Sequence, residues 1–138
     1  MPEEKNRLSR DPYQYARRVF FNRWKPYLLH AIHFDGATRF SRFTKQLPIT
    51  EKVLTANLRE LEKDGLIVRT VYAEVPVRVE YTLTEQGKSL IPILDSIYDW
   101  GWHAMRDKGL AIDPRGEMWH GYRERDEEFL ETPPQETE

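Results

Sequence analysis

The segment ITEKVLTANLRELEKDGLIVRTVY (residues 49–72) contains the signals for a helix, a stop and a strand in direct succession. Thr50 is a good helix N-cap, and Glu51 suits the positive end of the helix dipole. Gly65 predicts the end of the helix, because glycine readily takes the left-handed conformation that follows a last helical turn. The apolar residues at helical spacing, which we expect to be buried, are Leu54, Leu58 and Leu61, with Val53 beside them.

A β-hairpin is predicted directly after this helix. Residues 66–74 and 77–84 both favour strands, and the second run alternates apolar with polar side chains. Pro76 has no N–H to donate to a strand ladder, so the tip of the hairpin is expected near residues 73–76.

A shorter helix is predicted just before the first one. Residues 41–47 would bury Phe43 and Leu47, with Phe40 packing beneath the start of the helix and Pro48 ending it. Two short helices joined by a tight turn form a helix-turn-helix, and a hairpin after the second helix makes it a winged helix. In such a unit the second helix enters the major groove of DNA, and the hairpin tip lies along the backbone or the minor groove.

Longer helices are predicted on both sides of this unit. Residues 11–35 carry an apolar stripe at helical spacing, but Pro26 interrupts it, so we expect a break or kink near residues 22–26. Thr84 is expected to cap a further helix that runs to about Arg106.

The composition excludes several other classes of protein. The chain has 138 residues, enough for a single core, and its 39% hydrophobic and 12% aromatic content argues against a disordered chain. No apolar run approaches the roughly 20 residues of a membrane span, and no secretory signal is recognised, so we expect a cytoplasmic protein without membrane contact. The absence of cysteine excludes disulfides, thiolate zinc fingers and thiol chemistry.

The charge is distributed unevenly along the chain. Residues 1–106 hold 17 Lys and Arg against 13 Asp and Glu, whereas residues 107–138 hold 4 against 10. A basic body is compatible with a polyanionic partner. The acidic tail keeps a second hypothesis open, a winged-helix module that binds protein and not DNA, because a tail folded across the recognition face would repel phosphate.

Three motifs resemble a known family. They are LTxxLRELExDGL at residues 54–66, VEYxLTxxG at 79–87 and WG at 100–101. Through them the chain resembles, from about residue 11 to 105, the HxlR family of bacterial transcriptional regulators, relatives of the MarR-type winged helices. The resemblance implies a sequence-specific regulator that binds a pseudo-palindromic operator as a homodimer through helix 50–64 and wing 66–84, and that dimerises through its first and last helices.

The predicted fold is therefore α+β and mainly α, a winged helix-turn-helix with a two-stranded wing and flanking dimerisation helices. Residues 1–10 would form a mobile N-terminal arm, residues 11–106 the HxlR-type domain, and residues 107–138 an acidic C-terminal extension whose last residues are disordered.

Two positions depart from the family pattern. Many members place a cysteine before a proline near the N-terminus, where it can sense oxidants or aldehydes. Here Asp11 precedes Pro12, which excludes cysteine-based sensing. The family's Gly-Lys-Trp segment reads Asn22-Arg23-Trp24, so a different kink of the first helix is expected.

The polar face of the second helix supplies most candidates for DNA contact, because on a helix-turn-helix that face must meet the groove. The alternative for each residue is a merely solvated position. Lys52 is assigned to base edges in the groove and Arg59 to a phosphate. The full set of candidates is Arg39, Arg42, Thr50, Glu51, Lys52, Thr55, Arg59 and Arg78.

Four members of this set need separate comment. Arg39 and Arg42 precede the second helix and are assigned to backbone phosphates. Glu51 either accepts a hydrogen bond from a cytosine amino group or only serves the helix dipole. Arg78 either contacts DNA beside the wing or is simply solvated.

An aromatic set lies on the two flanking helices and comprises Trp24, Tyr98, Trp100 and Trp102. The number of aromatic residues exceeds what one small core needs, so we expect part of it at a dimer interface. The set would also suit a pocket for a small apolar effector, although core and dimer packing alone, with constitutive DNA binding, fits the sequence as well.

No pattern predicts an enzyme, a metal site or a cofactor. His30 and His33 are three residues apart, a spacing that can serve a metal, but no acidic or thiol residue follows at helical spacing. We find no paired carboxylates, no nucleophile with a base and no phosphate-binding loop in the sequence.

Overall fold

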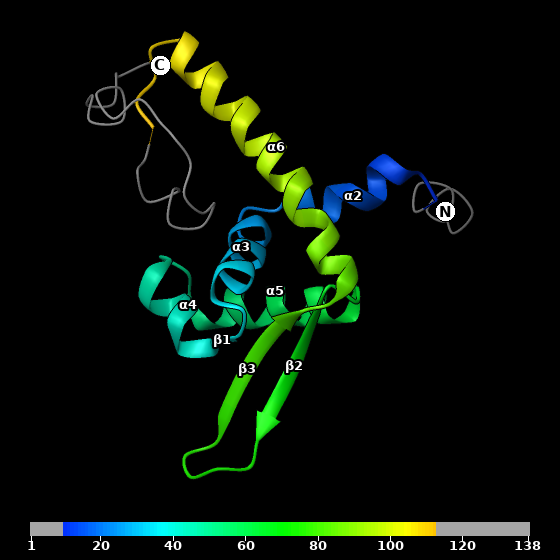
Figure 1. The fold of residues 1–138 in the computed structure, drawn as a ribbon, viewed down its shortest axis with the longest axis vertical. Helices are drawn as coiled ribbons and strands as arrows, with labels where there is room; N and C mark the ends of the chain where they lie inside the picture. Colours follow the sequence, from blue (N-terminus) through cyan, green and yellow to red (C-terminus); the bar gives the residue numbers. More distant parts are fainter. Residues whose placement is uncertain (1–9, 113–138) are drawn as a thin grey trace.

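The computed structural model describes residues 10–112, so residues 1–9 of the predicted N-terminal arm and residues 113–138 of the acidic extension lie outside the described residues. The elements, in chain order, are α2 (Pro12–Phe20), α3 (Lys25–Asp35), β1 (Thr38–Arg39), α4 (Phe40–Gln46), α5 (Glu51–Lys63), β2 (Ile67–Tyr72), β3 (Arg78–Leu83) and α6 (Glu85–Asp107) (Figure 1). This order confirms the predicted winged helix-turn-helix, in which α4 and α5 form the helix pair and β2–β3 the wing.

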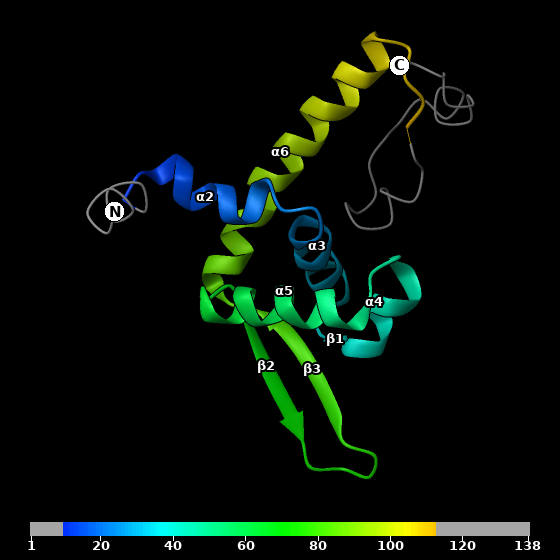
Figure 2. The same cartoon turned by 180° about the vertical axis from the view of Figure 1, so that it is seen from behind.

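Helices α3, α4 and α5 form the body of the molecule. In both views the β2–β3 hairpin extends from one end of this body, and the C-terminal part of α6 extends from the other (Figures 1 and 2). Among the helices of residues 10–112, none combines the length and the hydropathy that crossing a bilayer requires.

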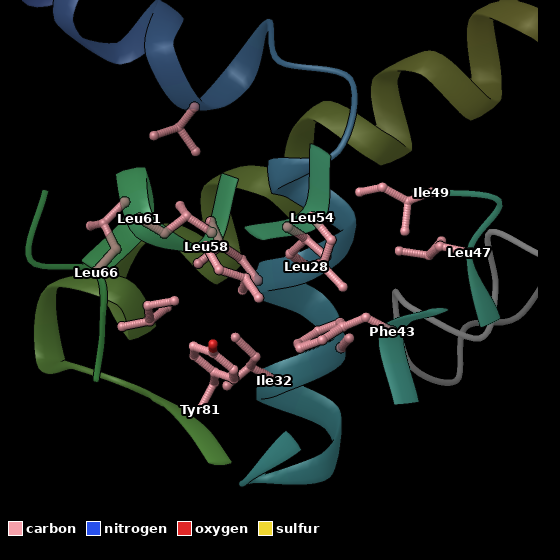
Figure 3. Packing of buried hydrophobic residues seen from close by; sticks show 14 of the residues in the cluster. Leu28, Ile32, Phe43, Leu47, Ile49, Leu54, Leu58, Leu61, Leu66 and Tyr81 are labelled. Atoms are coloured by element: carbon pink, nitrogen blue, oxygen red, sulfur yellow. The ribbon is translucent and has the colours of Figure 1, made fainter. Parts of the chain in front are cut away.

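The core lies between α5 and α3 and is closed by α4 and the sheet (Figure 3). Phe43 of α4 is fully buried and meets the ring of Tyr81 edge-on, with the ring centroids 6.2 Å apart. The predicted burial of Phe43 and Leu47 is confirmed, and so is that of the α5 stripe Leu54, Leu58 and Leu61.

The prediction for Val53 was wrong, because its side chain is 40% exposed. Asn57 is buried instead, on the inner face between Leu54 and Leu61. Its amide Nδ2 donates to the Val53 carbonyl oxygen at 2.9 Å, and this bond within the helix satisfies a donor that burial would otherwise leave unpaired.

The chain breaks between α2 and α3 where the sequence predicts it. The side-chain oxygen of Asn22 accepts hydrogen bonds from the backbone N–H groups of Trp24 (2.8 Å) and Lys25 (2.9 Å). Pro26 lies in the first turn of α3, where its missing N–H costs nothing. The proline therefore begins a new helix and does not bend a continuous one.

The sheet has a third strand that the sequence analysis did not predict. β1 pairs antiparallel with β3, with Thr38 opposite Tyr81 and Arg39 opposite Glu80, so the strand order is β1-β3-β2. Two residues are too short for an alternating pattern to show. The predicted hairpin strands were also too long, because residues 73–77 form the turn around Pro76.

One threonine joins three elements at the root of the wing. The hydroxyl oxygen of Thr84 accepts from the Gly87 N–H at 3.0 Å and so caps α6, and the hydroxyl donates to the Gly65 carbonyl at 2.6 Å. Gly65 has φ +76°, the left-handed conformation expected after α5. The end of α5, the wing and the start of α6 are therefore fixed to one another.

Candidate nucleic-acid interface

The outward face of α5 carries a stripe of three cations and one alanine. At 3.6 residues per turn, the direction opposite the buried stripe is occupied by residues 52, 56, 59 and 63. All four are exposed, and they are Lys52, Ala56, Arg59 and Lys63. Ala56 and Lys63 were not among the predicted contacts, although the spacing of four, three and four residues would have identified them.

The first turn of α5 has a capped and exposed start. The hydroxyl oxygen of Thr50 accepts from the Val53 N–H at 3.3 Å, which confirms the predicted N-cap and leaves the hydroxyl proton available to a ligand. Glu51 is exposed in the first helical turn, as both hypotheses for its role require. Thr55 is half-buried and lies on the side of α5 that faces the wing.

A groove of about 800 Å³ separates α5 from the hairpin. Thr55, Arg59 and Glu62 line it from α5, and residues 74–79 line it from the wing tip. Four arginines contribute to its walls and make it a cationic groove, namely Arg39, Arg59, Arg69 and Arg78.

Arg69 is a residue that the sequence analysis did not select. It lies two residues after the buried Ile67 on β2 and opposite Tyr81 on β3, so it points to the same side of the hairpin as the core. The alternation of β2 was the available signal for this placement. Arg69 therefore extends the cationic surface of α5 onto the root of the wing.

Arg78 is engaged within the wing. Its guanidinium forms ion pairs with Glu80 (2.6 Å) and Glu74 (3.1 Å) and lies 3.9 Å from the centroid of the Tyr72 ring. These contacts favour a role in holding the shape of the hairpin, and the predicted DNA contact of Arg78 stays a prediction.

Arg42 is also paired, but it is more accessible. Its Nε donates to the carboxylate of Asp35, which also accepts from the hydroxyl of Thr38 at 3.2 Å. The Arg42 side chain remains 44% exposed. Arg39 is exposed on β1 and lines both the cationic groove and a neighbouring hollow beside Arg42.

The four predicted aromatic residues face different environments within one chain. Trp24 is partly buried and packs against the core, Trp102 is 5% exposed, and Tyr98 is half-buried. Trp100 is 76% exposed.

The two histidines considered for a metal lie in different surroundings. His30 is buried, with its Nε2 2.9 Å from an Asp95 carboxylate oxygen of α6 and its Nδ1 3.0 Å from the Pro26 carbonyl oxygen. His33 is exposed. His30 therefore links α3 to α6.

Two ion pairs connect the N-terminal helices to the back of α5. Lys25 is only 3% exposed, and its Nζ lies 2.8 Å from the Glu60 carboxylate. Arg18 of α2 pairs with Asp64 at 2.9 Å. The hydrogen bond from Lys25 holds the pKa of Glu60 below its ordinary value of 4.5, against the opposing effect of burial, and the charges of Lys25, Arg18 and Lys63 act in the same direction as the bond.

The lowered pKa of Glu60 predicts a dependence of stability on pH. The folded state binds the proton less tightly than the unfolded state, so this contribution is present above the ordinary pKa and is lost as pH falls through the lowered value. The difference in free energy of unfolding between the wild type and Glu60→Gln should therefore shrink as pH falls below about 5. Urea unfolding at several pH values measures it, and a difference independent of pH would contradict the assignment.

The fold and this surface define a class of protein. A helix pair that presents a cationic, solvent-exposed helix beside an arginine-lined wing is typical of winged-helix transcriptional regulators that bind DNA. The chain belongs to the HxlR-like helix-turn-helix family, whose model matches residues 19–108.

Individual relatives agree with this assignment. A protein of Methanothermobacter thermautotrophicus described as an uncharacterized HTH-type transcriptional regulator is 55% identical over 80 residues, which cover 57% of this chain and 60% of that relative. The crystal structure of the HTH-type transcriptional regulator ytcD has a TM-score of 0.65 at 40% identity and covers 70% of this chain and 98% of that one. The redox regulator HypR in its reduced form has a TM-score of 0.64 at 42% identity, with 70% and 95% covered. The relatives are regulators and not enzymes.

Proposed function

We propose that the protein is a homodimeric regulator that binds a pseudo-palindromic operator through α5 and the β2–β3 wing. The observation that carries the proposal is the continuity of the outward α5 stripe with the cationic groove, because together they offer one basic surface to a DNA duplex. We expect the protein to act in the cytoplasm, where its DNA partner is found.

The residues divide by the part of DNA that they would contact. Lys52 heads the outward stripe and, with Thr50 and Thr55, is assigned to base edges in the major groove. Arg59 lies two turns further along α5 and is assigned to a backbone phosphate. The other assigned phosphate contacts are Arg39 and Arg42.

Selection from a random-sequence DNA library, followed by gel shift with the selected duplex, tests the proposal. Binding should weaken steeply as salt rises, because each phosphate contact releases counterions. Scrambled duplex of the same length is the control. The competing hypothesis, a protein-interaction module, predicts that the selection enriches no sequence. Any residual binding to DNA should then be independent of its sequence.

The proposed dimer rests on apolar side chains that one chain leaves uncovered. On α6, Ile93 and Ile97 are each 49% exposed and Trp100 is 76% exposed, and their spacing places them on one side of the helix. On and beside α2, Tyr13 is 85% and Phe21 is 82% exposed. Burial of these faces against a second copy would remove a large apolar area from water.

Replacement of Ile97 by aspartate should convert the dimer to a monomer. The substitution places a charge at the centre of the proposed interface, where it would be desolvated without a partner. Light scattering at micromolar concentration measures the mass, and Ser96→Asp, at the neighbouring exposed position, is the matched control. A wild-type protein that is monomeric under these conditions would refute the dimer.

A small apolar effector is proposed at the dimer junction, near Trp24, Tyr98, Trp100 and Trp102. The partly buried Trp24 and the exposed Trp100 are the aromatic surfaces that such a ligand would contact. A ligand there would need to bind better to a state in which the recognition helices no longer match the roughly 34–36 Å of one DNA turn.

Diamide should leave DNA affinity unchanged. HypR is described as a redox regulator, whereas this chain has no cysteine that a thiol oxidant could modify. Gel shift with and without diamide measures the effect, and a loss of binding that a reductant reverses would contradict the expectation.

A further inference from the structure

Polar contacts join the recognition helix α5 to α2 and to the start of α3, in addition to the apolar packing of Val19 and Phe20 on the core. Val19 is the one residue of α2 that is buried in the described structure. Arg18 reaches from α2 to Asp64 at the C-cap of α5. The buried Lys25 donates to the Arg18 carbonyl oxygen at 3.2 Å and pairs with Glu60 at 2.8 Å.

Open space lies between α2 and α5. A hollow of about 450 Å³ is lined by Arg17, Arg18 and Phe21 on one side and by Glu60 on the other, with Lys25 in its wall. Because side chains do not fill this space, the polar contacts around it help to hold the N-terminal helices in place against α5. Beside it, the Arg18–Asp64 pair joins α2 to α5, and the Lys25–Glu60 pair joins the first residue of α3 to α5.

The two pairs hold α5 at successive turns. Glu60 and Asp64 are four residues apart, and the Asp64 N–H donates to the Glu60 carbonyl oxygen at 2.9 Å, which joins their backbones as well. Both carboxylates face the N-terminal helices, whereas Arg59 and Lys63 face away from the core. Two fixed points on a rigid helix determine its direction, which a single point would not do.

We propose that the Arg18–Asp64 pair, from α2, and the Lys25–Glu60 pair, from the start of α3, are positioning contacts that set the direction of α5 relative to the N-terminal helices and thereby the separation of the two recognition helices on DNA. The proposal rests on the proposed dimer, in which α2 contributes to the interface. Hydrogen-bonded ion pairs suit this role because their geometry is directional.

Charge reversal at the Arg18–Asp64 pair, whose cation is exposed and not buried like Lys25, tests the proposal. Arg18→Glu and Asp64→Lys each place like charges opposite one another, and the double variant restores an opposite pair. The probes are the duplex that the wild type selects, the same duplex with one base pair added or removed between its half-sites, and an isolated half-site. Gel shift gives the affinities, and thermal unfolding gives the stability of each variant.

The wild type should prefer its selected spacing by roughly tenfold, within the usual range of coupling between sites. Each single variant should reduce this preference to within about twofold while its affinity for the isolated half-site changes little, and the double variant should restore the preference. A general loss of stability would instead lower the affinity for every duplex and leave the preference for one half-site spacing unchanged.

Two results would overturn the inference. If the single variants keep the wild-type preference, or lose affinity equally for all spacings and for the half-site, the pairs are structural only. If the wild type selects no DNA with two half-sites, the proposed function fails and the inference fails with it. The first result leaves the proposed function intact, so the two failures are distinguishable.

Discussion

Gly87→Ala is expected to destabilise the protein by about 3 kcal/mol or more, because the added methyl would meet backbone and not a movable side chain. A Cβ at this position would lie 2.1 Å from the carbonyl oxygen of Leu66 and 3.1 Å from its carbonyl carbon. The same oxygen accepts from the Thr84 N–H at 3.1 Å. Relief of the clash would therefore disturb the junction of α5, the wing and α6.

Urea unfolding monitored by circular dichroism measures this effect, and Gly101→Ala provides the matched control. A Cβ at Gly101, on the same helix, would have no atom within 4 Å in the protomer. Alanine is the better helix former, so this variant should be unchanged or more stable by up to about 1 kcal/mol. Equal stability of the two variants would show that the close approach at Gly87 is absent in solution.

Lys52→Ala and Arg59→Ala are expected to weaken DNA binding in different ways. Loss of a base-edge contact at Lys52 should cost about 1–3 kcal/mol on the selected duplex and relax specificity at one position. Loss of a phosphate contact at Arg59 should weaken selected and scrambled duplexes alike and reduce the salt slope by about one.

Salt titrations of both variants on both duplexes separate these outcomes. Lys63→Ala, at the far end of the outward stripe, is a useful comparison because it removes a cation of α5 that is most distant from the capped N-terminal turn. If Lys52→Ala and Arg59→Ala lower specific and non-specific binding equally, the division of roles is wrong.

The local signals in the sequence predicted most of the fold. The caps at Thr50 and Thr84 and the stop at Gly65 depend on neighbouring backbone groups, so a short stretch contains all the information they require. The break before α3 is of the same kind, since Asn22 and Pro26 act on the turn that contains them.

One error occurred where distant parts of the chain meet. β1 forms only because β3, some 40 residues later, provides a partner for Thr38 and Arg39. The burial of Asn57 in place of Val53 is an error of a different, local kind: a polar residue enters the core because a carbonyl of its own helix accepts from its amide.

For the candidate site, the sequence identified the recognition helix but not which side chains form ion pairs or line the groove. The engagement of Arg78 with two carboxylates and a ring, and the placement of Arg69 in the groove, depend on the register of the hairpin. The Lys25–Glu60 pair joins residues 35 positions apart, and no local pattern contains that information.

Helix α5 has an outward side, a side that faces the core and a side that carries Glu60 and Asp64. These sides determine which residues can be exchanged between relatives to change the DNA preference by protein engineering. Residues on the outward side, such as Lys52 and Arg59, are exposed and point away from the buried stripe, so they should be transplantable one at a time. Glu60 and Asp64 should instead be exchanged only together with Lys25 and Arg18, because their partners lie outside the helix. A graft of the whole helix that ignores these partners would carry the new base contacts at the wrong angle.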